Sequence, residues 1–229
     1  MYEFLHPEPP VDRVLLRAAA VDHVLSMRMA RDCAAGDRKA LRGLFAGFWL
    51  YVEGFEKAID RQVARLPIKP LAARYGQQRI RSFFAQAKQA VAEMKMEEGS
   101  HAVLWKTCAE EAGITLDFPE VPAVRSLLDS ANNPDPVLFF CWLAGTEYIA
   151  EELARFLCDA PGFLACFPDR RWKWGDVHRA EHEGPSHLEI DEDLARAYAG
   201  DGSKERLERA IYYCQRSFLL ATDAVYATL

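Results

Sequence analysis

Apolar and polar residues follow the period of an α-helix along most of this chain. Apolar positions recur three and four residues apart, and strong helix formers fill the positions between them. No segment shows the strict two-residue alternation that is typical of a half-buried strand. The pattern therefore predicts an all-α fold.

Glycine and proline residues divide this helical pattern into segments. Gly36 and Gly113 each follow a predicted helix, and Pro67 follows another. Ser186 is a suitable N-terminal cap for a helix that begins at His187. We expect about seven to nine helices. They cover residues 11–34, 37–65, 75–112, 122–131, 136–158, 170–183, a segment that starts at residue 187, and 203–228.

Length and composition point to one globular domain. The 229 residues are enough for one sizeable core, so we expect a single domain over residues 1–229. The formal net charge of −6 argues against a dedicated nucleic-acid binder, because contact with phosphates needs a basic surface. The longest apolar run, from Val137 to Ala144, is too short to span a bilayer, and the N-terminus does not resemble a signal peptide.

The six cysteines are widely spaced and form no Cys-x-x-Cys pair. Most of them lie among apolar residues, which is typical of small buried hydrophobic side chains in a reducing compartment. We therefore expect a cytoplasmic protein without a disulfide framework or a cysteine zinc site.

An acid–histidine pair lies in the third predicted helix. Glu98 and His101 are three residues apart, which places them on one face of a helix. Apolar residues flank this face, so the pair is a candidate for the interior. A carboxylate beside an imidazole suits iron or manganese. The alternative is a solvated glutamate beside an ordinary core histidine.

A second acid–histidine pair begins the helix that starts at residue 187. His187 and Asp191 are four residues apart and again share a helix face. His178 and His182 are also one helical turn apart, so they remain an alternative pair of ligands. Two helices that each offer an imidazole and a carboxylate to one interior suit a two-metal site.

The most apolar predicted helix, residues 136–158, carries two glutamates one turn apart, Glu147 and Glu151. A carboxylate buried without a partner costs several kcal/mol or takes up a proton, and a metal ion is a natural partner for it. In the alternative interpretation both carboxylates flank the apolar stripe and reach water. Glu53 and Glu56, in the predicted helix 37–65, are further candidate ligands.

The layout and the motifs resemble the heme-oxygenase-like diiron oxidases and oxygenases. Three motifs carry the resemblance: Glu98-x-x-His101, His187-x-x-x-Asp191 and Gly145-x-x-Tyr148-x-x-Glu151. The resemblance implies a single heme-oxygenase-like helical bundle, a fold shared with thiaminase-like and quinone-cofactor-synthesis proteins. It also implies a site for two Fe(II) ions with O2 as co-substrate. The implied metal ligands are Glu98, His101, Glu147 or Glu151, His187 and Asp191.

Many family members have a second histidine three residues after the aspartate of the last motif. Leu194 occupies that position here and cannot bind a metal ion. The choice between one and two metal ions, and between iron and manganese, therefore stays open.

The implied activity is oxidation or oxygenation of a small molecule that carries a carboxylate or an amine, such as an amino acid in specialised metabolism. Arg79 and Arg81 are candidate carboxylate-binding residues, and we expect a homodimer, the commonest soluble assembly. Two alternatives keep the fold. One is a metal-free thiaminase-like or quinone-cofactor-synthesis-like enzyme with Cys141 as nucleophile, and the other is a heme oxygenase with His23 as axial ligand. A non-catalytic helical interaction module is the third alternative.

Overall fold

The computed structural model describes residues 4–6, 8–179 and 186–229, with the backbone alone at residue 84 and over residues 86–100. Over this part the chain forms twelve α-helices, one π-helical turn and no strand. The all-α prediction is confirmed, whereas the predicted seven to nine helices are too few. The elements are α1 (Arg13–Ser26), α2 (Arg28–Ala34), α3 (Arg38–Arg42), η1 (Gly43–Gly47), α4 (Trp49–Val63), α5 (Ile68–Tyr75), α6 (Gln77–Glu111), α7 (Pro122–Ser130), α8 (Pro136–Cys158), α9 (Pro161–Leu164), α10 (Lys173–His178), α11 (His187–Ala199) and α12 (Lys204–Tyr226).

The additional helices arise where a predicted helix is interrupted. Met27 has an extended backbone (φ −63°, ψ 108°) and separates α1 from α2 within the predicted helix 11–34. The π-helical turn η1 interrupts the predicted helix 37–65 in the same way. Pro70 lies in the first turn of α5, where a proline removes no intrahelical hydrogen bond, so it does not prevent a helix there.

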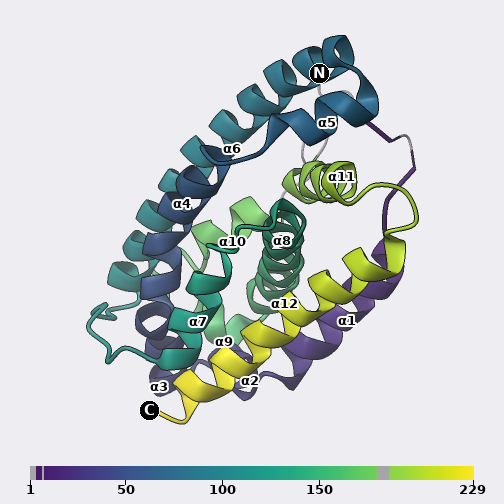
Figure 1. Ribbon diagram of the computed structural model, residues 1–229. Coiled ribbons are helices and arrows are strands. Elements are labelled where there is room, and N and C mark those ends of the chain that lie inside the picture. The colour runs from purple at the N-terminus through teal and green to yellow at the C-terminus, as the bar shows by residue number, and fades with distance from the viewer. Residues whose placement is uncertain (1–3, 7, 180–185) are drawn as a thin grey trace.

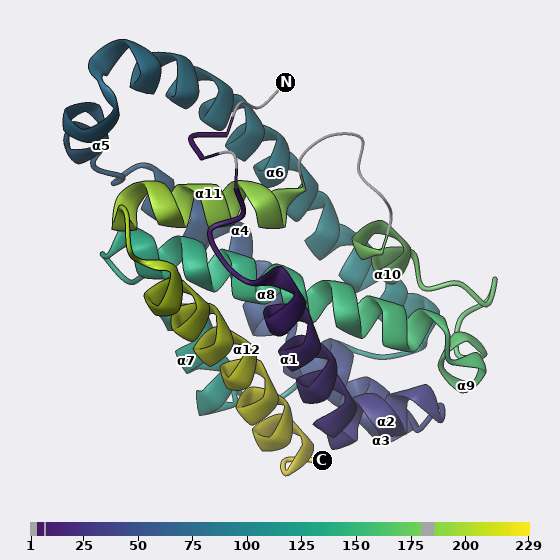
Figure 2. The same ribbon diagram turned by 90° about the vertical axis from the view of Figure 1, so that its right-hand side faces the viewer.

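Helix α8 runs through the middle of the molecule. Figure 1 shows α1 and α12 along one side of it and α4 and α6 along the other. Helix α8 contacts α1, α10, α11 and α12, which explains why it is the most apolar helix of the chain. In Figure 2 α11 lies alongside α8, and α5 with the first turns of α6 forms one end of the molecule.

Several helices begin at a capping residue. The side chain of Asp12 accepts a hydrogen bond from the Leu15 amide at the start of α1. Asp135 accepts one from the Val137 amide at the start of α8, where Pro136 occupies the first helical position. Helix α11 ends at Gly200, which adopts φ +83°.

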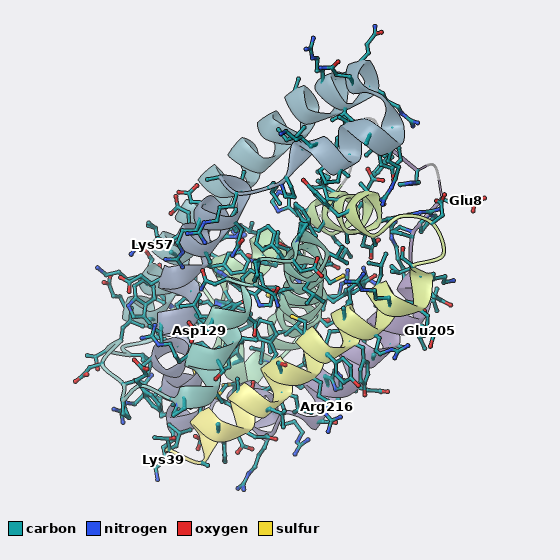
Figure 3. All side chains as sticks on the ribbon, viewed as in Figure 1. Glu8, Lys39, Lys57, Asp129, Glu205 and Arg216 are labelled. Carbon is teal, nitrogen blue, oxygen red and sulfur yellow. The ribbon has the colours of Figure 1, made fainter. Side chains whose placement is uncertain are left out.

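The core is apolar and most charged groups lie outside it. Figure 3 shows side chains such as Glu8, Lys57 and Arg216 on the periphery, directed away from the bundle. All six cysteines are free thiols and five of them are buried, as the sequence predicts. Over the described residues, no helix combines the length and the apolar character that crossing a membrane requires.

Candidate functional site

Two side chains from the predicted metal-binding motifs meet between α8 and α11. The Oε1 atom of Glu147 lies 3.9 Å from the Nδ1 atom of His187. The two side chains are 15% and 17% exposed, so both are partly screened from water. They come from helices that pack along each other, which makes their approach a property of the bundle and not of a loop.

The start of α11 fixes His187 at the first position of the helix. Ser186 and Glu189 form a capping box: the Ser186 hydroxyl accepts from the Glu189 amide at 3.3 Å, and the Glu189 carboxylate accepts from the Ser186 amide at 3.1 Å. The predicted N-terminal cap is confirmed. Its effect is to hold the backbone of His187 in one conformation.

Three consecutive acids on α11 are buried. Asp191, Glu192 and Asp193 are only 1%, 0% and 2% exposed. Consecutive helical residues point about 100° apart, so these carboxylates face three different neighbours. Sequence reasoning selected Asp191 and did not anticipate that Glu192 and Asp193 are also buried.

Glu192 joins α11 to α1 and α8. One of its oxygens accepts a hydrogen bond from the Tyr148 hydroxyl at 2.8 Å, and the other pairs with Nε of Arg13 at 2.7 Å. Burial raises the pKa of Glu192 and also the pKa of Tyr148. Arg13 also pairs with Glu189 at 2.7 Å. This network positions the helix that carries His187 and Asp191.

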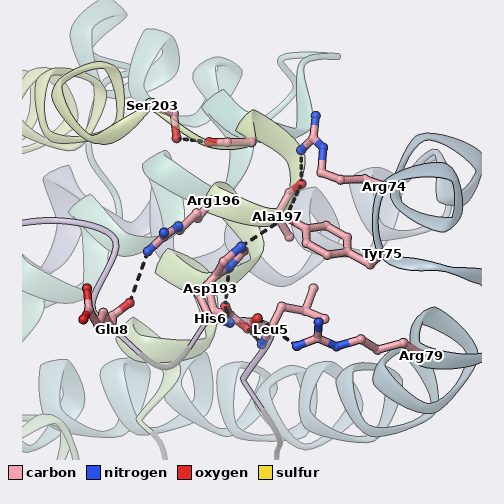
Figure 4. Close-up of polar contacts among 11 residues, drawn as sticks. Leu5, His6, Glu8, Arg74, Tyr75, Arg79, Asp193, Arg196, Ala197 and Ser203 are labelled. Carbon is pink, nitrogen blue, oxygen red and sulfur yellow. Dashed lines mark hydrogen bonds and ion pairs between the residues drawn. The ribbon is translucent and has the colours of Figure 1, made fainter.

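Asp193 holds the N-terminal segment against α11 (Figure 4). Its carboxylate accepts from the Leu5 amide at 3.0 Å and from the His6 amide at 3.2 Å. Arg79 of α6 donates to the Leu5 carbonyl at 3.0 Å, and Tyr75 of α5 contacts Nε2 of His6 at 3.2 Å. Arg79, a candidate carboxylate-binding residue, therefore holds the backbone of this segment.

His101 is buried in α6 and faces α10. Its ring centroid lies 4.5 Å from that of His178, and the His178 ring stacks on Trp174 at 3.6 Å. The Nδ1 atom of His178 lies 2.9 Å from the Trp174 carbonyl. A carbonyl only accepts, so the Nδ1 atom of His178 carries a proton and donates to it. The structure thus brings His101, from the predicted Glu98–His101 pair, next to His178, from the pair considered as an alternative to His187–Asp191.

Glu147 and Glu151 occupy different environments. Glu151 pairs with Nη1 of Arg17 at 3.0 Å and with Nη2 of Arg155 at 3.3 Å. Glu152, which is 8% exposed, pairs with the same two arginines. The charge of Glu151 is therefore already balanced by two arginines. Of these two candidate glutamates, Glu147 is the one whose side chain approaches His187.

The other candidate ligands are more scattered. The side chain of Glu98 and the whole of His182 lie outside the described residues. Glu53 is exposed on α4 and Glu56 is half-buried there. Among the described side chains, no three histidines, cysteines, aspartates or glutamates form a group that could hold a metal ion. Leu194 is 2% exposed and belongs to the core.

An apolar cavity of about 80 Å³ lies between α2, η1, α4, α6, α8 and α12. Side chains at its wall include Met27, Leu44, Tyr51, Trp105 and Trp174. A second, more open groove of about 430 Å³ lies on the surface between α7, α8 and α12.

Cys141 and His23, the candidates for a nucleophile and for a heme ligand in the two alternative enzymes, are both buried. Cys141 is 1% exposed, and burial raises the pKa of its thiol to about 12, so it is protonated at neutral pH. The described residues that line the apolar cavity do not include it. His23 is buried against Tyr212 of α12, with 5.3 Å between ring centroids.

Comparison with known proteins relates the chain to others through its fold. No family model matches the sequence, and no curated protein matches it at a significant level. The crystal structure of a TenA homolog from Pseudomonas syringae pv. tomato superposes with a TM-score of 0.65 at 14% identity. The match covers 93% of this chain and 90% of that chain. At this identity the likeness shows that the two chains share an all-helical fold, and nothing finer.

Proposed function

We propose that this protein is an iron-dependent oxidase or oxygenase that uses O2 on a small molecule. The observation that carries the proposal is the approach of Glu147 to His187 on two packed helices. Two atoms that each lie about 2.1 Å from one metal ion are at most about 4.2 Å apart. The 3.9 Å between Oε1 and Nδ1 is within this limit.

The other residues that the resemblance implies carry donors that suit iron. Asp191 lies one turn beyond His187 on α11, and His101 of α6 carries an imidazole. Carboxylate and imidazole donors suit Fe(II), and Glu98 would complete the set of ligands that the resemblance implies. When bound, Fe(II) would reduce O2 and so provide the oxidising power for the reaction.

The protein groups around these residues have two tasks. The Arg13–Glu192–Tyr148 network holds α1, α8 and α11 in register, so that Glu147 and His187 keep their separation. Arg17 and Arg155 neutralise Glu151 and Glu152, so these two carboxylates of α8 already have cationic partners from the protein.

The test compares metal content after anaerobic loading with Fe(II). We expect iron in the wild type and its loss in Glu147→Gln and His187→Ala. Glu151→Gln is the matched control, because it makes the same change one turn along α8 and should keep the iron. Equal iron content in all four proteins, or none in the wild type, would contradict the proposal.

A metal-free enzyme of the thiaminase-like kind is the second candidate, and the fold of the TenA homolog favours it. It requires a nucleophilic cysteine, and the buried Cys141 would first have to become exposed and lose its proton. This candidate predicts that Cys141→Ser abolishes activity with metal content unchanged. The iron-dependent reaction predicts that activity survives this substitution.

A further inference from the structure

The apolar cavity between α2, η1, α4, α6, α8 and α12 has a wall whose polar groups are already satisfied. The hydroxyls of Tyr51 and Thr146 lie 2.9 Å apart, and Thr146 also donates to the Trp142 carbonyl. Thr222 donates to the Phe218 carbonyl at 2.8 Å. These hydroxyls therefore offer little hydrogen bonding to a molecule inside.

The described wall also carries no charge. The described residues that line the cavity include no aspartate, glutamate, lysine, arginine or histidine. A carboxylate or an ammonium group placed there would lose its hydration without gaining a partner, at a cost of several kcal/mol. The cavity is thus selective against the charged groups of an amino acid.

Part of the wall can yield to an occupant. At about 80 Å³ the cavity is smaller than the ~150 Å³ of an engineered cavity that binds benzene. Met27 and Met29 form one side of it, and methionine is an unbranched, flexible side chain that adapts to irregular space. Met27 lies at the break between α1 and α2, so its backbone is not held within a helix. Small movements of these two side chains would enlarge the cavity.

The cavity adjoins the proposed metal-binding residues. Trp105 lies one turn after His101 on α6, and Trp174 stacks on His178, whose ring contacts that of His101. Ile149 and Ala150 line the cavity two and three residues after Glu147 on α8. The π-helical turn η1 contributes Leu44, and π-helical turns are frequent at functional sites.

We infer that the cavity binds an uncharged hydrocarbon segment of the substrate, with any charged group of that substrate left outside. This inference rests on the proposed function for its link to catalysis, because Trp105 and Trp174 in the cavity wall lie close to His101 and His178. It changes the expected substrate from a small amino acid to a molecule with an aliphatic or aromatic portion.

The test is an NMR titration of protein labelled with 13C at the methionine methyl groups, of which the chain has five. Benzene and n-pentane are the aromatic and aliphatic probes, and glycine is the charged one. We expect saturable shifts of the Met27 and Met29 methyl signals with either hydrocarbon and none with glycine. Saturation by one hydrocarbon alone would support the inference and identify the preferred class.

Two leucine substitutions sharpen the test. Ala30→Leu fills the cavity from α2 and should abolish saturable binding. Ala210→Leu places the same side chain in the surface groove between α7, α8 and α12 and should leave binding intact. If Ala30→Leu does not fold, Ala150→Met fills the cavity from α8 in its place.

The inference is overturned if the wild type shows no saturable shift, if glycine shifts the same signals equally, or if the filled variant binds like the wild type. Iron content, measured on the same samples, separates this result from the proposed function. Iron without hydrocarbon binding contradicts the inference alone. Hydrocarbon binding without iron contradicts the proposed function and leaves the cavity as a hydrocarbon site.

Discussion

The hydroxyl of Tyr148 donates a 2.8 Å hydrogen bond to Glu192, and both residues are completely buried. Tyr148 follows Glu147 on α8, and Glu192 follows Asp191 on α11. The bond therefore joins the two helices beside the residues proposed to bind iron. Because Arg13 of α1 takes the other oxygen of Glu192, one carboxylate connects three helices.

We expect Tyr148→Phe to lower the free energy of unfolding by about 1–3 kcal/mol, because it leaves an oxygen of a buried carboxylate without its donor. Urea unfolding measures this change. Tyr198→Phe is the matched control, since the buried Tyr198 hydroxyl has no hydrogen-bond partner among the described residues. Equal destabilisation by both substitutions would show that the Tyr148–Glu192 bond contributes nothing specific.

The capping box at the start of α11 gives a second prediction. Ser186→Ala removes the acceptor for the Glu189 amide and should destabilise the protein by about 1 kcal/mol. Amide hydrogen exchange in the first turn of α11 should become faster, and Fe(II) should bind more weakly if His187 is a ligand. Ser203→Ala is the control, because Ser203 precedes α12 without forming a side-chain cap. Unchanged exchange in α11 of Ser186→Ala would contradict this account.

His23 makes stability depend on pH. Burial lowers its pKa from the ordinary value of about 6.5, so below that pH the unfolded chain binds a proton that the folded protein does not. The stability contributed by neutral His23 is complete above about pH 6.5 and decreases as the pH falls toward the folded-state pKa. His23→Leu should therefore lose less stability than the wild type between about pH 7.5 and 5.5. If the wild type and His23→Leu gave parallel curves of unfolding free energy against pH, His23 would not be the source of this pH dependence.

Gly145 lets α12 approach α8 closely. A Cβ atom there would lie 2.6 Å from Cβ of Cys214 and 3.1 Å from the Ile211 carbonyl oxygen. Since both atoms are fixed to the α12 backbone, Gly145→Ala should destabilise the protein by about 1–3 kcal/mol.

Gly54 of α4 is the matched control. A Cβ atom there would meet only the Leu128 side chain, with its terminal methyl nearest at 2.5 Å, and this side chain can move. Both substitutions gain about 0.5–1 kcal/mol of helix propensity, so Gly54→Ala should cost less than Gly145→Ala because only its contact can be relieved by a side-chain movement. Thermal unfolding of the two variants decides the point, and an equal loss at both positions would contradict the role assigned to Gly145.

Much of the fold could be predicted from local signals. Ser186 begins α11 and Gly113 follows α6, because capping and left-handed conformations depend on single residues. The break at Met27 could not be predicted, since the neighbouring sequence contains no proline or glycine. The helix over residues 68–75 was not predicted, because it contains Pro70 and a proline interrupts a helix at any position beyond the first turn.

The site was less predictable because residues four apart on a helix share a face. Glu147 and Glu151 satisfy the same pattern, and only the positions of His187 and Arg17 separate them in the structure. Burial of Glu192 was missed because its partners lie in distant parts of the sequence. A long-range partner of this kind leaves no periodic signal.

The consecutive buried acids Glu192 and Asp193 restrict the rotational setting of α11. Its neighbours each supply a different complement: an arginine and a phenol for Glu192, and backbone amides for Asp193. Rolling the helix by one residue would press each carboxylate against a surface built for another. Carboxylates without a matching donor would therefore oppose this rotation even where the apolar contacts tolerated it.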